Sequence, residues 1–326
     1  MTFEIQLEPS GHIIEQEGKE TILRSGMRAG LNLAHNCING SCGKCQGKLL
    51  KGELIKSRHH DFALNEERIK ENYFLTCCHQ PATDIVIEMH ETNSVKDIPF
   101  QEIIAKVSKV ENLTDKVISL SLRTSRSKVL DFLAGQKVQV CIDDESCLEL
   151  AIASCPCDGL NLRFHLQNEG DALSERILKK LKKGQKLIVK GPLGQFTLDE
   201  SFEGGLNFIA WNTSFAQVQS MIDHAISHDP DREIGLFWFA DESTGHYLEN
   251  YCQAWNDVLD NFSFHKINAE SPGKVLRILS GNMNFIENSS GAQLYASLPF
   301  DMAIPAKELL IKNSNIKSGN IFFDIN

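Results

Sequence analysis

The chain has 326 residues, of which 42% are hydrophobic and 23% charged, with only 9 Pro and 22 Gly. This composition excludes disordered, collagenous and coiled-coil chains, and the length favours two or three globular domains. The net charge of −10 argues against nucleic acid or an anionic membrane as partner and is compatible with a basic protein partner. No apolar run reaches the roughly 18 residues of a membrane span, and the N-terminus lacks the basic and apolar segments of a secretory signal. We therefore expect a cytoplasmic protein in a reducing compartment, where disulfides are not expected.

The first unit, residues 1–93, has the pattern of a small α+β domain. Its apolar periodicity predicts a strand, a short helix and a closing strand at 3–7, 20–30 and 84–90. Residues 35–47 have little periodicity and are expected to form a loop. A polar segment that ends in Pro99 predicts a linker to the rest of the chain.

The remaining chain shows two further patterns. Residues 100–200 contain closely spaced strand patterns, which are typical of an antiparallel β-barrel. These strands are expected at 102–110, 117–124, 136–142, 148–154, 160–166 and 187–194, with a helix at 171–183. Residues 205–326 alternate apolar strands with helical stretches, which predicts a parallel sheet. The predicted fold class is therefore multidomain, α+β and α/β.

Cysteine spacing gives the strongest chemical signal. Five of the ten cysteines lie in the first 80 residues. Cys37, Cys42 and Cys45 are separated by four and two residues, and Cys77 follows farther along the chain. This is the plant-type spacing for a [2Fe–2S] cluster, in which four thiolates converge on two irons. The spacing predicts a metal-bearing first domain with these four ligands.

Two alternatives bear on this site. Zinc also binds four cysteines, but structural zinc sites usually use two pairs of cysteines that are close in sequence. Here three candidate ligands are close together and the fourth lies apart. Cys78 adjoins Cys77 and could also reach the iron; we choose Cys77. Gly40 and Gly43 are expected to let backbone N–H groups turn toward the sulfurs.

The residues around these cysteines resemble a known family. The segment 37–45 with its two glycines, followed by Gly52, 73–77 and Pro81, resembles a plant-type ferredoxin domain. This likeness covers residues 1–93 and implies a β-grasp fold with a [2Fe–2S] cluster. The family commonly has Gln at the position of Cys78.

The rest of the chain resembles a ferredoxin reductase-like module. Such modules are fused to ferredoxins in reductase components of bacterial oxygenases and in sugar-deoxygenation reductases similar to CDP-6-deoxy-glucoseen reductase. The likeness rests on residues 132–136, 152–154, 170–174, 191–196 and 321–324. It implies a flavin-binding antiparallel β-barrel at 100–200 and an NAD(P)-binding parallel-sheet domain at 205–326.

The flavin motif departs from the family pattern. The family has an Arg that binds the flavin phosphate and a hydroxyl that faces the flavin ring, where this chain has Leu148 and Ala151, with Glu149 between them. Loss of the Arg removes a charge-assisted contact of about 1.5 to 3 kcal/mol. Gly170 and Ser174 are the remaining candidates for a flavin phosphate site at a helix start, although helix capping explains Ser174 equally well. We expect FAD and FMN not to bind tightly.

The nucleotide motifs depart in the same direction. Trp211 and the polar residues 212–214 replace a glycine-rich turn that lets a pyrophosphate approach the backbone. Asp241 replaces a basic residue, and residues 296–299 replace a Cys-Gly-Pro-Pro motif whose thiol lies near the nicotinamide. These changes predict that NAD(P)H does not bind.

Cys155 and Cys157 lie beside the expected flavin position. With one residue between them they are a poor metal pair, and buried free cysteines are the expected state.

Three functional hypotheses follow. In the first, the chain is an iron–sulfur electron-transfer protein that passes single electrons to a redox partner protein, with a reductase-like module that lacks flavin and NAD(P)H. In the second, it is an NAD(P)H-dependent flavin and iron–sulfur oxidoreductase that serves an oxygenase or similar system. In the third, it is a redox sensor that reports the state of its cluster through partner binding.

Overall fold

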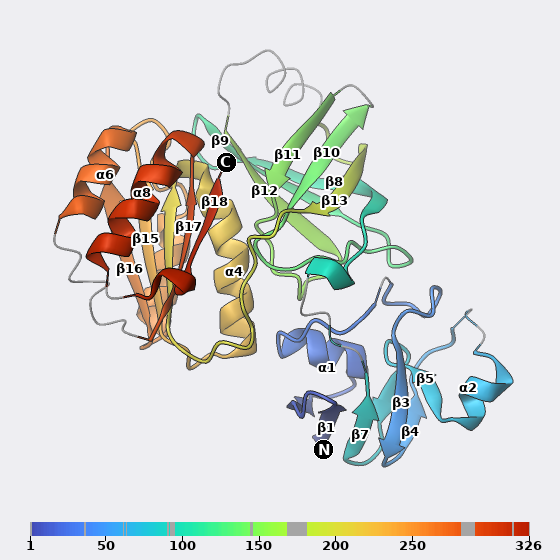
Figure 1. The fold of residues 1–326 in the computed structure, drawn as a ribbon. Coiled ribbons are helices and arrows are strands. Elements are labelled where there is room, and N and C mark those ends of the chain that lie inside the picture. The colour runs from blue at the N-terminus through green and yellow to red at the C-terminus, as the bar shows by residue number, and fades with distance from the viewer. Residues whose placement is uncertain are drawn as a thin grey trace.

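The computed structural model describes residues 2–35, 37–60, 62, 64–89, 91, 95–143, 146–167, 181–281, 291–314 and 316–325. Three units follow one another along the chain, each built around its own sheet (Figure 1). The N-terminal unit lies at one end of the molecule, below the antiparallel sheet and the parallel sheet (Figure 1). Among the described residues, no helix has the length and apolar character needed to span a membrane.

The N-terminal unit is a five-stranded mixed sheet in the order β2-β1-β7-β3-β5. Its strands are β1 (Phe3–Glu8), β2 (Ile13–Gln16), β3 (Gln46–Lys51), β5 (Tyr73–Leu75) and β7 (Ile85–Glu88), and β4 (Leu54–Lys56) pairs separately with β6 (His79–Pro81). Helix α1 (Ile22–Arg28) begins at Thr21, whose side chain accepts a hydrogen bond from the Arg24 N–H at 3.4 Å. Helix α2 (Glu66–Lys70) buries no side chain. The strands and helix expected in this unit are confirmed.

The second unit is a six-stranded antiparallel sheet in the order β11-β10-β13-β8-β9-β12. Its strands are β8 (Gln101–Asn112), β9 (Val117–Arg123), β10 (Lys137–Asp143), β11 (Ser146–Ala151), β12 (Asn161–Gln167) and β13 (Lys186–Leu193), preceded by η1 (Val95–Asp97). The sheet curls into a partly open barrel, because the Ala153 N–H donates to the Arg163 carbonyl at 2.7 Å and joins the two edge strands. Most of the helix expected at 171–183 lies outside the described residues.

The third unit is a five-stranded parallel sheet in the order β16-β15-β14-β17-β18. Its elements are β14 (Leu206–Trp211), η2 (Asn212–Ser214), α4 (Phe215–His228), β15 (Ile234–Ala240), α5 (Glu249–Val258), β16 (Phe262–Asn268), α6 (Pro272–Ser280), β17 (Gln293–Leu298), α8 (Phe300–Asn313), η3 (Ser318–Asn320) and β18 (Ile321–Ile325). Helices α4 and α5 pack on one face, and α6 and α8 on the other. Successive strands are added outward from β14 to β16 and then on the other side of β14 from β17 to β18, so the strand order switches between β14 and β17, where ligands of such folds bind.

The three units are packed against one another. Val129 and Leu160 of the barrel belong to the hydrophobic core of the N-terminal unit. Ala134 and Phe196 of the barrel belong to the core that α4 forms with the parallel sheet. The barrel therefore joins the other two units through buried apolar contacts.

Four cysteines form two disulfides, which corrects the expectation that this chain has none. Cys141 and Cys147 lie directly opposite each other on β10 and β11, and a disulfide joins them. A second disulfide joins Cys155 to Cys157 across Pro156. Local geometry brings each pair within bonding distance, and the compartment argument used above carries no information about that geometry.

Candidate metal centre and neighbouring sites

The loop between α1 and β3 is built by glycines that adopt left-handed backbone conformations. Gly40 has φ of 80° and Gly43 has φ of 71°, conformations that other residues adopt at a cost. Space is also limited, because a Cβ at Gly43 would lie 2.4 Å from the Phe62 ring and one at Gly40 would lie 2.6 Å from Cys78 Sγ. The loop can follow this path only with glycine at both positions.

This loop brings the four predicted ligands together in two pairs of thiols. Cys45 Sγ lies 3.1 Å from Cys77 Sγ, and the Cys37 thiol is hydrogen-bonded to the Cys42 thiol. Three of the four side chains are buried, while Cys42 is partly exposed. Among the described residues, no three His, Cys, Asp or Glu side chains surround one common metal position. Two pairs of thiols match the donor set of a cluster with two irons better than that of a single zinc ion.

Each thiol pair shares its protons unequally. Burial opposes ionisation of Cys37, but hydrogen bonds from the Cys42 thiol and the Asn39 N–H outweigh it and lower the pKa of Cys37 to about 7. Burial raises the pKa of Cys42 to about 11. The contact between Cys45 and Cys77 lowers the pKa of Cys45 and raises that of Cys77. The second proton of each pair is thus hard to remove without a cation, so metal binding would release it.

Cys78 occupies a different position from Cys77. Its Sγ lies 3.5 Å from Cys77 Sγ, and its backbone carbonyl accepts hydrogen bonds from the N–H and hydroxyl of Ser57. Cys77 is the one of the two that contacts a thiol of the loop, Cys45. This arrangement favours Cys77 over Cys78 as the fourth ligand.

Replacing Gly43 with Ala is expected to remove most of the iron from the purified protein. The new Cβ carries the cost of a left-handed backbone, about 1–2 kcal/mol, and also displaces Phe62, which packs on the loop. Gly11→Ala is the matched control, because Gly11 has φ of 78° in the same unit but open space around it. Iron content per chain checks this prediction, and equal iron in the two variants would contradict it.

Three arginines lie near Cys77. Arg24, Arg58 and Arg126 line a small cavity of about 80 Å³ that Cys77 also lines. Ile38 is held from two sides, because its N–H donates to the Arg126 carbonyl at 3.2 Å and its carbonyl accepts from Arg58 at 3.0 Å. The positive charges can offset the negative charge that four thiolates bring.

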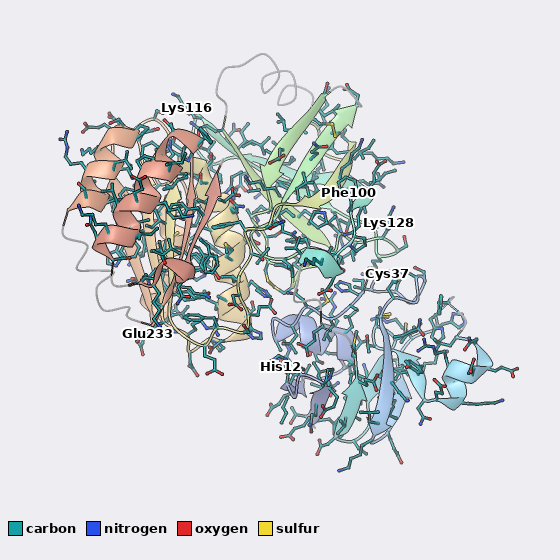
Figure 2. All side chains as sticks on the ribbon, in the orientation of Figure 1. His12, Cys37, Phe100, Lys116, Lys128 and Glu233 are labelled. Carbon is teal, nitrogen blue, oxygen red and sulfur yellow. A yellow bond between two sulfur atoms is a disulfide. The ribbon has the colours of Figure 1, made fainter. Side chains whose placement is uncertain are left out.

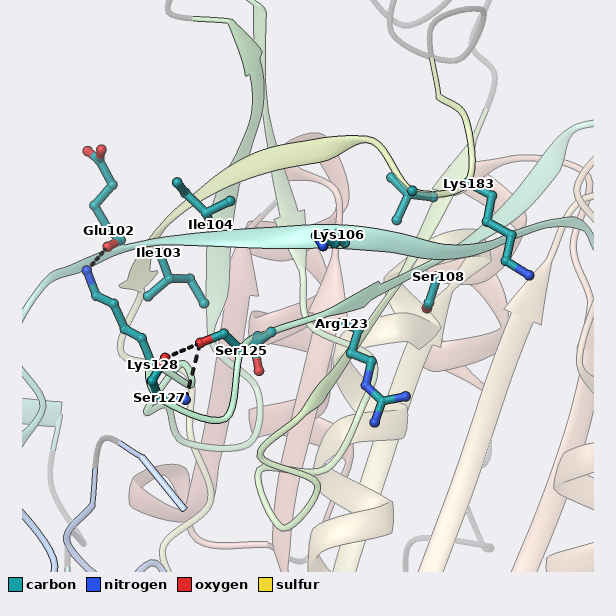
Figure 3. A pocket seen from close by; sticks show the side chains of 13 residues that line it. Glu102, Ile103, Ile104, Lys106, Ser108, Arg123, Ser125, Ser127, Lys128 and Lys183 are labelled. Atoms are coloured by element: carbon teal, nitrogen blue, oxygen red, sulfur yellow. Dashed lines mark hydrogen bonds between the residues drawn. The ribbon is translucent and has the colours of Figure 1, made fainter. Parts of the chain in front are cut away.

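Beside this cavity lies a larger groove of about 840 Å³ on the barrel (Figure 3). Lys128 reaches the main-chain carbonyl of Glu102 at one end, and Arg123 and Lys183 lie toward the other (Figure 3). Apolar side chains, including the 59% exposed Ile104, also line it. Its other lining residues are Ile103, Lys106, Val107, Ser108, Thr124, Ser125, Ser127 and Gly184. Ser125, Ser127 and Lys128 line the groove, while Arg126 of the same segment lines the cavity beside Cys77.

At the expected flavin position, the side chains are mainly apolar. Leu148 and Leu150 pack against the barrel core, while Glu149 is exposed. Lys137 lies opposite Ala151 on the neighbouring strand, and its Nζ is 2.6 Å from Asp324 Oδ2 on β18. The side chains of Lys137 and Asp324 are only 12% and 14% exposed. Gly170 and Ser174, the other two candidates, lie outside the described residues.

Where the strand order of the parallel sheet switches, between β14 and β17, the polar side chains form hydrogen bonds with one another. The Asn212 amide donates to Asp241 Oδ2 at 2.7 Å, and the Ser297 hydroxyl donates to Gln217 Oε1 at 2.8 Å. Partial burial opposes ionisation of Asp241, but hydrogen bonds from the Thr244 N–H and Asn212 outweigh it and lower the pKa of this carboxyl. The ionised form of Asp241 is thus favoured at the position where the family has a basic residue.

Trp238 has a packing role in this region. It is fully buried, and its ring stacks on Phe215 with ring centroids 4.0 Å apart. Its indole N–H donates to the Asn212 carbonyl at 3.0 Å. Phe215 is the first residue of α4, so a buried aromatic pair stands at the start of this helix.

Sequence reasoning missed several residues that matter here. Lys137 directly follows the Gly-Gln of a family motif, and Asp324 belongs to the closing motif, but no spacing in the sequence pairs them. Arg58 and Arg126 lie in segments with no motif. A search for charged residues inside the family motifs would have found Lys137 and Asp324.

Known proteins resemble large parts of this chain. Residues 5–82 match the model of a 2Fe-2S iron-sulfur cluster binding domain. The reductase component of a phenol 2-monooxygenase from Pseudomonas sp. (strain CF600) is 32% identical over 73% of this chain and 68% of the relative. The CDP-6-deoxy-L-threo-D-glycero-4-hexulose-3-dehydrase reductase of Yersinia pestis is 28% identical over 73% of this chain and 71% of the relative.

A solved structure shows the same fold. A cytochrome P450 reductase of Amycolatopsis superposes with a TM-score of 0.60, at 19% identity, and the match covers 99% of this chain and 98% of that one. The match spans the N-terminal unit, the barrel and the parallel sheet together. The predicted arrangement of a ferredoxin fold followed by a reductase-like fold is therefore confirmed.

Proposed function

The chain belongs to the family of reductases that join a [2Fe–2S] ferredoxin domain to a ferredoxin reductase-like module, and from this premise we propose that it is an iron–sulfur electron-transfer protein. It would accept one electron at a time and pass it to a partner protein. The ferredoxin domain would comprise residues 1–93, the barrel residues 100–200, and the parallel-sheet domain, which resembles an NAD(P)-binding domain, residues 205–326.

The two thiol pairs are the observation that carries this proposal. Cys37 with Cys42, and Cys45 with Cys77, supply two thiolates for each of two irons. The cluster would provide one-electron chemistry when bound. The loop glycines would fix the ligands, and the neighbouring arginines would stabilise the added negative charge of the reduced state.

We further propose that the reductase-like module has lost flavin and NAD(P)H binding. Three observations support this: Leu148 packs against the barrel core at the position of the phosphate-binding Arg, the ion pair of Lys137 and Asp324 adjoins Ala151, and Asp241 carries negative charge at the nucleotide position. A flavin or dinucleotide phosphate would have to replace its hydration with donors, and these residues offer few.

A second candidate function rests on the comparisons. The relatives are named reductase components of oxygenases or a dehydrase reductase, and the fold extends over both reductase domains. These similarities support a second proposal, that the chain is an NAD(P)H-dependent flavin and iron–sulfur oxidoreductase. It would act as the reductase component of an oxygenase or similar system.

We propose that the redox partner presents an acidic surface to the groove on the barrel. Lys106, Arg123, Lys128 and Lys183 are exposed around it, and Arg126, two residues before Lys128, lines the cavity that Cys77 also lines. The net charge of the whole chain predicted a basic partner. Charges close to the cluster ligands control docking more strongly than distant charges, because salt screens the distant ones. Figure 2 shows Cys37 on the side of the N-terminal unit that faces Lys128.

Small inorganic oxidants test this local charge. We expect anionic ferricyanide to oxidise the dithionite-reduced cluster faster at low salt than at high salt, and cationic hexaamminecobalt(III) to do the reverse. Reversing two charges by Arg126→Glu with Lys128→Glu should slow ferricyanide about tenfold at low ionic strength, since each reversal near the site changes the free energy by roughly 0.5–1 kcal/mol. Stopped-flow absorbance of the cluster measures these rates.

The matched control is Lys116→Glu. Lys116 is exposed on the same barrel but lies at its far end from Cys37 (Figure 2). This variant should leave the ferricyanide rate nearly unchanged. If ferricyanide accelerates with added salt, or if the control slows as much as the double variant, the net charge governs access and the acidic-partner proposal is wrong.

A further inference from the structure

The turn between β11 and β12 carries a cysteine pair that electron transfer through the cluster does not use. Cys155 and Cys157 are joined by a disulfide. Cys155 is 7% exposed, whereas Cys157 is partly open to solvent. An external thiolate can therefore reach the Cys157 sulfur more readily than the Cys155 sulfur.

The Cys155 sulfur is surrounded by groups that stabilise it as a leaving thiolate. The Cys157 N–H donates to Cys155 Sγ at 3.2 Å. His224 Nδ1 lies 3.8 Å from the same sulfur. An N–H donor lowers the energy of negative charge on sulfur, and an imidazole at this distance can deliver a proton.

His224 of the third unit is held in a defined orientation by one residue from each of the other two units. Its Nε2 lies 2.8 Å from Glu200 Oε1, and the Asn32 amide donates to the same carboxylate oxygen at 2.8 Å. The side chains of His224 and Glu200 are only 2% and 15% exposed. Because the carboxylate accepts the Nε2 proton, Nδ1 is the nitrogen that faces sulfur.

We propose that Cys155 and Cys157 are a redox-active pair that undergoes thiol–disulfide exchange with external dithiols, an activity beyond the electron transfer proposed above. The thiolate of the dithiol attacks Cys157 Sγ, the Cys155–Cys157 bond breaks, and Cys155 leaves as a thiolate. This thiolate takes the Nδ1 proton of His224 in its imidazolium form, since the Nε2 proton stays with Glu200. The second thiol of the dithiol then attacks the mixed disulfide and releases Cys157. The external dithiol is oxidised to a disulfide, and the protein pair is reduced to two thiols.

The disulfide between Cys141 and Cys147 serves as an internal comparison. Cys141 is fully buried, and Cys147 Sγ lies 3.8 Å from the Asp143 carbonyl oxygen. This neighbour cannot deliver a proton to a leaving thiolate. The two disulfides of one molecule thus differ in the feature that the proposal requires.

The test follows both disulfides in the same sample. The full-length protein is treated anaerobically with limiting dithiothreitol, free thiols are alkylated at intervals, and mass spectrometry quantifies each pair. We expect Cys155–Cys157 to be reduced at least about tenfold faster than Cys141–Cys147, since general acid catalysis contributes a factor of this size or more. Equal rates, or free thiols at Cys155 and Cys157 after air oxidation, would overturn the proposal.

Two variants identify the role of the histidine. His224→Gln should slow reduction of Cys155–Cys157 about tenfold or more and leave that of Cys141–Cys147 unchanged. Glu200→Gln, which removes only the charge that positions His224, should slow the same disulfide and decides the outcome if the first variant fails to fold. Cluster absorbance is recorded in parallel, so loss of the cluster is distinguished from loss of exchange. If neither variant slows the Cys155–Cys157 exchange, His224 is structural and the proposal is wrong.

Discussion

Replacing Cys77 with Ser is expected to abolish the native absorption spectrum of the cluster, whereas Cys78→Ser should leave it nearly intact. Cys77 Sγ lies 3.1 Å from Cys45 Sγ and so completes the second thiol pair. A serine hydroxyl ionises far less readily than a thiol and is a harder donor, so one iron would lose a ligand that suits it. Cys78 is buried, and its Sγ lies 3.5 Å from Cys77 Sγ, beside rather than within the pair.

Iron and acid-labile sulfide, measured with the spectrum, make this comparison quantitative. The wild type and Cys78→Ser should each contain about two of each per chain, as two bridged irons require. The two variants are a matched pair, because they make the same substitution at adjacent buried positions. The opposite pattern would move the fourth ligand to Cys78, and zinc in place of iron in anaerobically prepared protein would refute the cluster itself.

Calorimetric titration of FAD and FMN into the unmodified protein is expected to show no binding at the micromolar level, which corresponds to about −8 kcal/mol. Leu148 offers no charge to the flavin phosphate, and Glu149 adds negative charge nearby, while Lys137 balances the charge of Asp324. The partly buried ion pair between Lys137 and Asp324 would also have to separate to admit a ligand beside Ala151, which leaves two partly buried charges poorly compensated.

A double variant distinguishes a missing contact from a filled site. Leu148→Arg with Ala151→Ser restores the family side chains, and we expect it to bind flavin no better, because overpacking and the ion pair remain. A dissociation constant near or below a micromolar for the unmodified protein would show that the missing Arg is compensated elsewhere. The flavoenzyme function would then be the better proposal.

The sequence predicted the helices and strands whose apolar side chains pack in a hydrophobic core. Strand β1 alternates because one of its faces packs on a core. Strands β14 and β15 are continuous apolar runs because both of their faces are buried. Helix α2 was missed because it buries no side chain and so leaves no periodic pattern. The helix capped by Thr21 was found because its buried face recurs at helical spacing.

The site was predictable only where it is local in sequence. The spacing of Cys37, Cys42 and Cys45 reflects one short loop, so it could be read directly. The contacts between Lys137 and Asp324, and between Cys155 and His224, join distant segments whose approach depends on packing of whole units. The disulfides were missed for a different reason: each joins cysteines close together in sequence, but the expected reducing compartment had been used to exclude such bonds.

The most direct test of the central claim is the absorption spectrum of protein purified without oxygen, recorded before and after NADH or NADPH and then after dithionite. We predict the absorption of a [2Fe–2S] cluster without flavin bands, no change on adding either nicotinamide nucleotide, and bleaching by dithionite. Flavin bands in the isolated protein, together with bleaching of the cluster by NADH or NADPH, would contradict this account and identify the chain as a working reductase.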